Sequence, residues 1–225
     1  MIDKRCYWIR NFSTLMNHLV YAGSWIFRQL SSLLDELKPL KCFYICAMNN
    51  LQDVLEIGRI DLAELKALQE LSKKTFYEAF AWSTSPEDMQ AYLDTAFSEE
   101  RLGSELQGPD SQFYFARLHG RPVGYLKLNF GKAQTEDLEG YGMEIERIYI
   151  LQEFQGRKIG QQLIARAIGI AEELKMEHVW LGVWEKNSGA IALYQRQGFV
   201  QVGSHPFMMG KDHQTDLILK RILKG

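Results

Sequence analysis

The chain carries its clearest structural signal at Gln155-Gly156-Arg157-Lys158-Ile159-Gly160. A β-prone run, residues 144–150, precedes this segment, and an apolar pattern of helical spacing follows it to Leu174. A turn between a strand and a helix exposes backbone N–H groups at the positive end of the helix, where phosphate binds favourably. The spacing is neither that of a P-loop nor GxGxxG. By itself the segment leaves phosphate binding and ordinary turn geometry equally open.

The residues around this segment alternate between strand and helix patterns. Strands are predicted over residues 113–118, 123–130, 144–150, 178–184, 199–202 and 217–219, and helices over 61–80, 86–97, 156–174 and 187–197. The order strand, helix, strand, helix in the middle predicts two adjacent parallel strands joined by a right-handed crossover. The hairpin-like strands on either side predict a mixed sheet. The expected fold class is therefore α/β.

A second informative segment runs from Asn187 to Phe199, with Ala190, Tyr194 and Gly198 at fixed spacing between them. Together the two segments resemble the GNAT superfamily of N-acetyltransferases. That family has a Q/R-x-x-G-x-G/A loop after its fourth strand and an N-x-x-A-x-x-x-Y-x-x-x-G-F segment after its fifth. The loop departs from the family pattern at Lys158, where glycine is usual. The resemblance implies a mostly antiparallel sheet with helices on both faces and two central parallel strands that splay apart.

A closer resemblance covers most of residues 56–221. The strings at 111–115, 124–127, 133–136, 144–150, 180–187 and 209–217 look like those of the PaiA-type spermine/spermidine N-acetyltransferases. This likeness implies acetyl-CoA as the donor and a polyamine as the acceptor, with transfer by direct attack in a ternary complex. Two alternatives stay open: a protein or peptide N-acetyltransferase on the same scaffold, and a regulatory CoA-binding protein with little turnover.

The resemblance also implies which residues contact acetyl-CoA. The main chain of the fourth strand would hold the pantetheine arm, the loop would hold the pyrophosphate, and Asn187 would contact CoA or cap its helix. The expected set is Ile148, Tyr149, Ile150, Gln155, Gly156, Arg157, Lys158, Ile159, Gly160, Gln161 and Asn187.

Catalysis of acetyl transfer to an amine needs a group that takes a proton and a group that gives one. A primary alkylamine has a pKa near 10.4, as lysine does, so it arrives mostly protonated and a nearby carboxylate can accept the proton. Glu144 and Glu146 are two residues apart on one strand, so both are expected on one face with Ile148 and Ile150. Each glutamate could instead be a paired structural residue. Tyr194 occupies the family's general-acid position, and the competing role is core packing.

A polyamine also needs further carboxylates and aromatic rings along its path. The candidates are Glu78, Glu87, Asp88, Glu185, Trp82, Tyr92 and Trp184. No metal site is expected, since His205 and His213 lack partners at ligand spacing. The formal net charge of −2 argues against a strongly basic, nucleic-acid-coating protein. A monomer or homodimer in the cytoplasm is expected.

Residues 1–50 differ in composition from the rest of the chain. They hold all three cysteines and six Lys or Arg against three acids, whereas the remainder carries 20 basic and 25 acidic residues. Their longest apolar run, residues 19–27, is too short to span a bilayer. We therefore expect residues 1–50 to be an N-terminal extension and the acetyltransferase domain to occupy residues 56–221. Residues 1–47 are expected to be either accessory or upstream sequence included before a true start at Met48.

Overall fold

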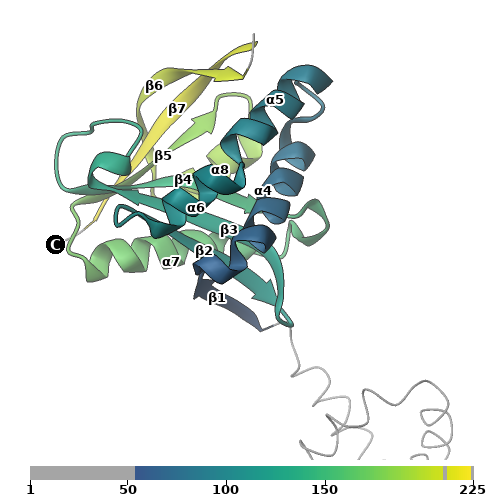
Figure 1. The fold of residues 1–225 in the computed structure, drawn as a ribbon. Helices are drawn as coiled ribbons and strands as arrows, with labels where there is room; N and C mark the ends of the chain where they lie inside the picture. Colours follow the sequence, from purple (N-terminus) through teal and green to yellow (C-terminus); the bar gives the residue numbers. More distant parts are fainter. Residues whose placement is uncertain (1–53, 210–211, 224–225) are drawn as a thin grey trace, which may run out of the picture. The chain divides into compact units, whose positions relative to one another are not determined.

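The structure is a computed structural model that describes residues 54–209 and 212–223. Its centre is one seven-stranded sheet in the order β1-β2-β3-β4-β5-β7-β6 (Figure 1). The strands are β1 Leu55–Arg59, β2 Ser111–Leu118, β3 Arg121–Phe130, β4 Gly142–Ile150, β5 His178–Trp184, β6 Val200–Met209 and β7 Asp212–Ile222. β4 and β5 run parallel, and the other neighbouring strands run antiparallel. The mixed, mostly antiparallel α/β sheet predicted from the sequence is confirmed.

Helices cover both faces of this sheet (Figure 1). The helices α4 Leu65–Phe80, α5 Pro86–Ala96 and α6 Glu99–Gln107 lie on one face, and α7 Ile159–Glu173 and α8 Ser188–Arg196 lie on the other. Serine caps start two of them: Ser85 accepts from the N–H of Asp88, and Ser98 accepts from the N–H of Arg101. Sequence patterning missed α6, although a serine followed by two glutamates is a recognisable helix start.

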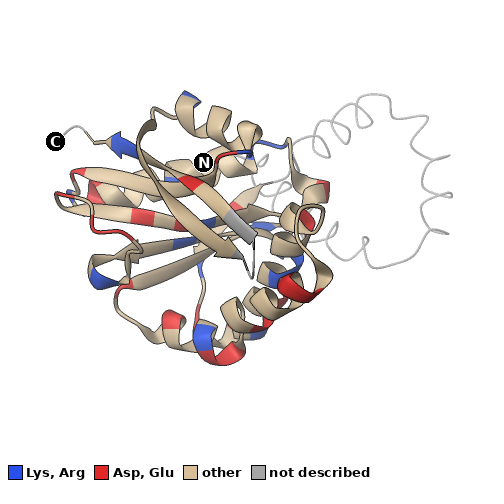
Figure 2. Ribbon diagram, turned by 90° about the horizontal axis from the view of Figure 1, so that it is seen from above, with Lys and Arg blue, Asp and Glu red and all other residues tan. Residues whose placement is uncertain are grey.

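The two layers enclose separate hydrophobic cores. The α7 core, between the sheet and α7 and α8, contains Met143, Ile145, Leu163, Ile164, Ala167, Val179, Leu181 and Tyr194. The α4 core, on the opposite face, contains Leu68, Phe76, Leu93, Phe97, Leu102, Phe113, Phe115 and Tyr125. In the view of Figure 2, acidic and basic residues are interspersed over helices and strands rather than gathered on one element.

β4 and β5 pair over only three rungs, which end at Glu144 and Trp180. On its other side β4 pairs with β3 through Ile145 and then Arg147, so that Glu146 has no partner and forms a β-bulge. A bulge bends its strand and increases the local twist. The bulge therefore coincides with the point where β4 separates from β5. We call the separation of the two strands beyond Glu144 and Trp180 the gap. The residues of β4 beyond the bulge have one main-chain edge facing it. This is the predicted splay of the parallel pair.

The bulge overturns one prediction about side-chain direction. Glu144 and Glu146 do share a face, because Asn129 Nδ2 donates to both carboxylates. Ile148 and Ile150 do not share it: they pack against the α7 core on the opposite face. Simple alternation fails here because the inserted residue shifts the side-chain period by one.

Several element bounds differ from prediction for local reasons. The α7 helix begins at Ile159 rather than Gly156, since Gly156 and Lys158 both have positive φ. Strands β6 and β7 extend well beyond the predicted residues, and Pro206 is accommodated because β6 lies at the sheet edge. Strand β1 was not predicted. Within the described residues no helix is long and apolar enough to cross a membrane. The expectation for residues 1–50 lies outside the described residues.

Candidate active site

Glu144 is buried on β4 with both carboxylate oxygens hydrogen-bonded. Oε2 accepts from the Thr135 N–H at 2.9 Å and from Asn129 Nδ2 at 3.1 Å, and Oε1 accepts from Thr135 Oγ1 at 2.6 Å. Burial raises the pKa of Glu144, and the bonds from Thr135 and Asn129 only partly oppose the rise. Glu144 is thus a desolvated, fully bonded carboxyl beneath the β3–β4 loop.

Glu146, at the bulge, belongs to a cluster of four charged side chains. Lys127 Nζ lies 2.5 Å from Glu146 Oε2 and 2.9 Å from Glu105 Oε2, while Arg147 Nη2 lies 3.0 Å from Glu146 Oε1. Burial favours the neutral form of Glu146, but Arg147 and Lys127 outweigh it and hold its pKa below the usual range. Two cations balance two anions, which is the condition for burying such groups without a large penalty.

The cluster includes residues that sequence reasoning missed. Lys127 and Asn129 on β3 both contact Glu146, and Glu105 on α6 contacts Lys127. A sequence signal for Lys127 and Asn129 was available: on a predicted strand they alternate with the apolar residues Leu126 and Leu128, which are buried.

The loop after β4 has the form expected of an anion-binding turn. Gln155 follows a short 3-10 turn, η3 Gln152–Phe154, and its Nε2 donates to the Ile150 carbonyl at 3.3 Å. Gly156 at φ +78° and Lys158 at φ +62° turn the chain into α7. The N–H groups at the start of a helix have no partner within it, so those of Ile159, Gly160 and Gln161 are free of the helical ladder. Arg157 is exposed, with its guanidinium 5.2 Å from the Phe154 ring.

The end of β4 lies directly against this loop and α8. A Cβ added at Gly160 would lie 3.3 Å from Ile150 Cδ1 and 3.5 Å from Leu193 Cδ2. Glycine therefore lets the first turn of α7 approach the strand. The side chains of Ile148 and Ile150 pack inwards, while Tyr149 stacks on Tyr125 with ring centroids 5.9 Å apart. Because these side chains pack into the two cores, it is the main chain of residues 148–150 that borders the gap.

Tyr194 and Asn187 are both on or next to α8, which follows β5. Asn187 Oδ1 accepts from the N–H of Ala190 at 3.1 Å and so caps the helix. The Tyr194 ring is buried against Phe199, with centroids 6.0 Å apart, and burial raises the pKa of its hydroxyl. Burial also raises the pKa of Tyr149, which packs against the α4 core, whereas Tyr194 lies in the α7 core.

The residues predicted to surround a polyamine fall into different places. Trp184 lies 5.5 Å from Trp82 and 6.2 Å from Phe80 between ring centroids, which gives an aromatic group at the end of β5. Tyr92 packs on Phe76 with centroids 4.5 Å apart.

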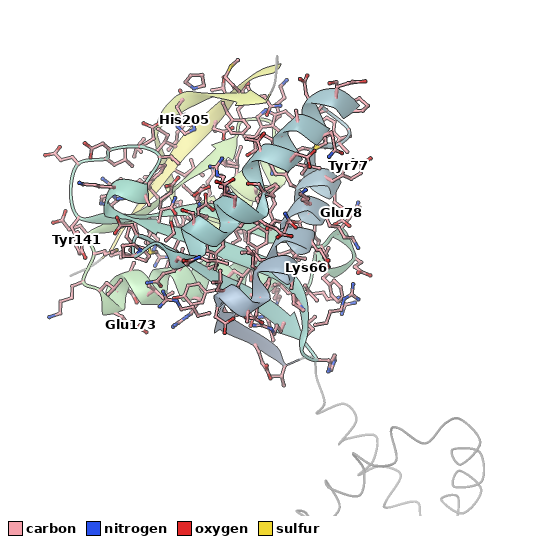
Figure 3. The ribbon with its side chains drawn as sticks, viewed as in Figure 1. Lys66, Tyr77, Glu78, Tyr141, Glu173 and His205 are labelled. Atoms are coloured by element: carbon pink, nitrogen blue, oxygen red, sulfur yellow. The ribbon has the colours of Figure 1, made fainter. Side chains whose placement is uncertain are left out.

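The predicted acids are dispersed. Glu78, labelled on α4 in Figure 3, accepts from the N–H of Gln152 at 2.8 Å, and Asp88 bonds to its own helix cap, Ser85. Glu87 and Glu185 are exposed. Where side chains are described, no group of three or more His, Cys, Asp or Glu residues is placed to hold a metal ion. The side chain of His213 lies outside that description.

Comparisons with known proteins identify the family to which this fold belongs. The model of the acetyltransferase (GNAT) family matches residues 65–199, which is more than half of the chain. The chain belongs to this family. It is accordingly an acetyl-CoA-dependent N-acetyltransferase, with acetyl-CoA as co-substrate.

Individual relatives extend the match. An uncharacterized N-acetyltransferase from the pepI 3' region of Lactobacillus delbrueckii subsp. lactis is 39% identical over 76% of this chain and 96% of its own length. The spermidine N(1)-acetyltransferase of Thermoplasma acidophilum is 23% identical over 72% of this chain and 99% of its own. The crystal structure of the PaiA N-acetyltransferase from T. acidophilum in complex with coenzyme A has a TM-score of 0.63 at 21% identity, over 75% of this chain and 99% of that one. At that identity the structural likeness establishes the fold.

Lys158 provides a test of the loop, because a lysine at φ +62° is strained where glycine is usual. We expect Lys158→Gly to leave the free energy of unfolding unchanged or to raise it by up to ~1 kcal/mol. We also expect it to weaken acetyl-CoA binding, by no more than about fivefold, since an exposed charge pair contributes at most about 1 kcal/mol. Thermal unfolding and calorimetric titration measure the two effects.

Lys175, at φ +57° after α7, is the matched control. Lys175→Gly relieves the same backbone strain away from the loop, so its acetyl-CoA affinity should equal that of the wild type. Equal weakening in both variants would contradict a role for Lys158 in binding the donor.

Proposed function

We propose that this enzyme transfers the acetyl group of acetyl-CoA to a primary amine of spermidine or spermine in the cytoplasm, by direct attack in a ternary complex. The observation that carries the proposal is the bulge at Glu146, which sets a carboxylate at the point where β4 and β5 part. The anion-binding loop, residues 155–160, follows β4 on one side of that gap. The aromatic group of Trp82 and Trp184 lies at the end of β5 on the other side. The likeness to a spermidine N(1)-acetyltransferase supports this acceptor class.

In the proposed complex the donor lies along the unpaired edge of β4. The pyrophosphate is bound by the N–H groups of residues 159–161, with Arg157 and Lys158 adding charge. The pantetheine arm and the thioester carbonyl meet the main chain of residues 148–150, where an N–H group stabilises the developing oxyanion. The amine nitrogen attacks the carbonyl carbon, a C–N bond forms and the C–S bond breaks.

Glu146 is the better candidate for the base on grounds of access. Glu144 has the raised pKa that suits a general base, but it lies within the paired rungs and is 3% exposed. Glu146 lies at the opening of the gap, and its side chain is 16% exposed. Both oxygens of Glu146 are engaged by Lys127, Asn129 and Arg147. In the proposed mechanism Glu146 therefore accepts the proton of the amine through a bridging water molecule.

The acceptor class is tested by acetyl-CoA consumption against spermidine, spermine, diamines and peptides with free N-termini. We expect the highest kcat/KM with spermidine or spermine. A preference for peptides would favour the protein N-acetyltransferase alternative. Tight CoA binding with no turnover of any amine would favour a regulatory CoA-binding protein.

Tyr194 is the proposed acid that protonates the departing CoA thiolate. We expect Tyr194→Phe to lower kcat by about 10²–10⁴, the usual effect of losing one proton-transfer group. The buried ring is kept, so the KM for acetyl-CoA and the unfolding temperature should change little. Steady-state kinetics and thermal unfolding measure these quantities.

Tyr114→Phe is the control, since Tyr114 is another buried tyrosine, whose hydroxyl bonds to Gln112 away from the gap. It should turn over spermidine as the wild type does. Intact turnover in Tyr194→Phe would show that another group protonates the thiolate.

Glu146→Gln needs a charge-balanced design. Removing one anion from the buried cluster leaves Lys127 and Arg147 facing Glu105 alone, which destabilises by ~3–5 kcal/mol. The double variant Glu146→Gln/Lys127→Met restores neutrality. We expect it to unfold near the wild-type temperature and to lose about 10²-fold or more in kcat.

The matched comparison is Glu144→Gln, which should lose less activity when assayed well below its own unfolding temperature. An equal or larger loss in Glu144→Gln would instead assign the base role to Glu144.

A further inference from the structure

Asp216, on β7, is a half-buried carboxylate for which the proposed mechanism has no use. Its Cα partners are Trp184 on β5 and His205 on β6. Residues directly opposite each other in antiparallel strands point to the same face. Trp184, Asp216 and His205 therefore form a row across three strands, which we call the β5–β6 row. Figure 3 labels His205 on β6.

The β5–β6 row stands beside the gap between β4 and β5. A Cβ added at Gly182, an exposed glycine, would lie 3.7 Å from both Asp216 Oδ2 and His205 Nε2. Gly182 is two residues beyond the last rung that β5 shares with β4, so it lies about 7 Å further along the strand. Glu146 is likewise two residues beyond that rung on β4. Glu146 on β4 and Asp216 on β7, whose carboxylate lies next to Gly182, are thus placed on opposite sides of the gap.

Contacts of β6 show which face of the sheet the row occupies. Phe207, two residues from His205 on β6, packs on Tyr92 of α5 with ring centroids 6.1 Å apart. The row therefore lies on the α4-core side of the sheet.

Asp216 differs from Glu146 in that no Lys or Arg whose side chain is described forms an ion pair with it. Lys186 Nζ lies 5.7 Å from the Trp184 ring centroid without such a pairing to Asp216. His205, the strand partner of Asp216 on β6, has its Nδ1 2.8 Å from Glu136 Oε1 on the β3–β4 loop. Burial raises the pKa of Asp216, and His205 only partly opposes the rise. A desolvated carboxylate without a cation is unfavourable unless a ligand supplies one.

The other end of the row is aromatic. The Trp184 indole Nε1 is buried without a hydrogen-bond partner, and its ring neighbours Trp82 and Phe80. Trp82 is 73% exposed, so this aromatic group is open to solvent at one side. An ammonium group at Asp216 would have indole surface beside it, against which a methylene chain can pack.

We propose that Asp216 binds the second, non-reacting ammonium group of a diamine or polyamine acceptor while Trp184 packs against the methylene chain. This inference rests on the proposed function and deepens it, since it names the residue that distinguishes a polyamine, with its second ammonium group, from a monoamine. Asp216 is then a specificity-determining residue, and Glu136 with His205 forms the border of its site.

The test compares acceptors that share a reacting amine but differ in the second charge. For Asp216→Asn we expect kcat/KM to fall 10- to 100-fold with spermidine and 1,4-diaminobutane, and to change less than twofold with n-butylamine. Asp137→Asn removes an exposed acid beside Glu136 and is the control, with no change for any amine. The unfolding temperature of Asp216→Asn should be unchanged or higher, because an unpaired desolvated charge is removed.

Calorimetric binding of spermidine to the CoA complex separates this inference from the proposed function. At least tenfold weaker binding to Asp216→Asn than to the wild type supports the site even if no amine is acetylated, and in that case only the proposed function fails. The inference is overturned by equal spermidine binding in both proteins, by no spermidine binding to the wild type, or by an equal loss of kcat/KM with n-butylamine.

Discussion

One inserted residue in β4 governs the arrangement of this site. Because Glu146 has no partner on β3, the strand changes its twist and its side-chain alternation at the same point. Beyond it, β4 and β5 separate, and Ile148 and Ile150 turn to the α7 core. A strand that stayed paired with β5 would leave no free main-chain edge for the proposed donor. The gap between the proposed donor and acceptor sides opens at this bulge.

The bulge can exist in a buried setting because its charges are neutralised locally. Lys127 and Arg147 face Glu146 and Glu105 within a cluster that is largely removed from water. In such surroundings an isolated carboxylate is strongly disfavoured, whereas a balanced set is tolerated. The same balance keeps Glu146 ionised by lowering its pKa. Asp216 forms no ion pair with any Lys or Arg whose side chain is described, and burial raises the pKa of its carboxyl instead.

Local sequence predicted the parts of the site that depend on local chemistry. The turn at residues 155–160, the cap at Asn187 and the strand–helix order are all encoded within a few residues of where they act. The bulge was not predictable in this way, because it is defined by which β3 residue faces which β4 residue. The same is true of Asp216, whose position beside Trp184 follows from a strand pairing more than 30 residues apart in the chain. The family resemblance over residues 209–217 includes Asp216 but by itself gives this residue no role.

The hydrogen bond from the Gln152 N–H to Glu78 joins the two parts of the molecule to which we assign different substrates. Glu78 belongs to α4, which covers the proposed acceptor face, while Gln152 begins the turn that leads into the proposed donor loop. A displacement of α4 that kept this hydrogen bond would carry η3 with it. If binding of one substrate shifts the contact, linkage requires each substrate to alter the affinity for the other by the same factor. A single carboxylate–amide contact is thus the place where movements of the two substrate sides would meet.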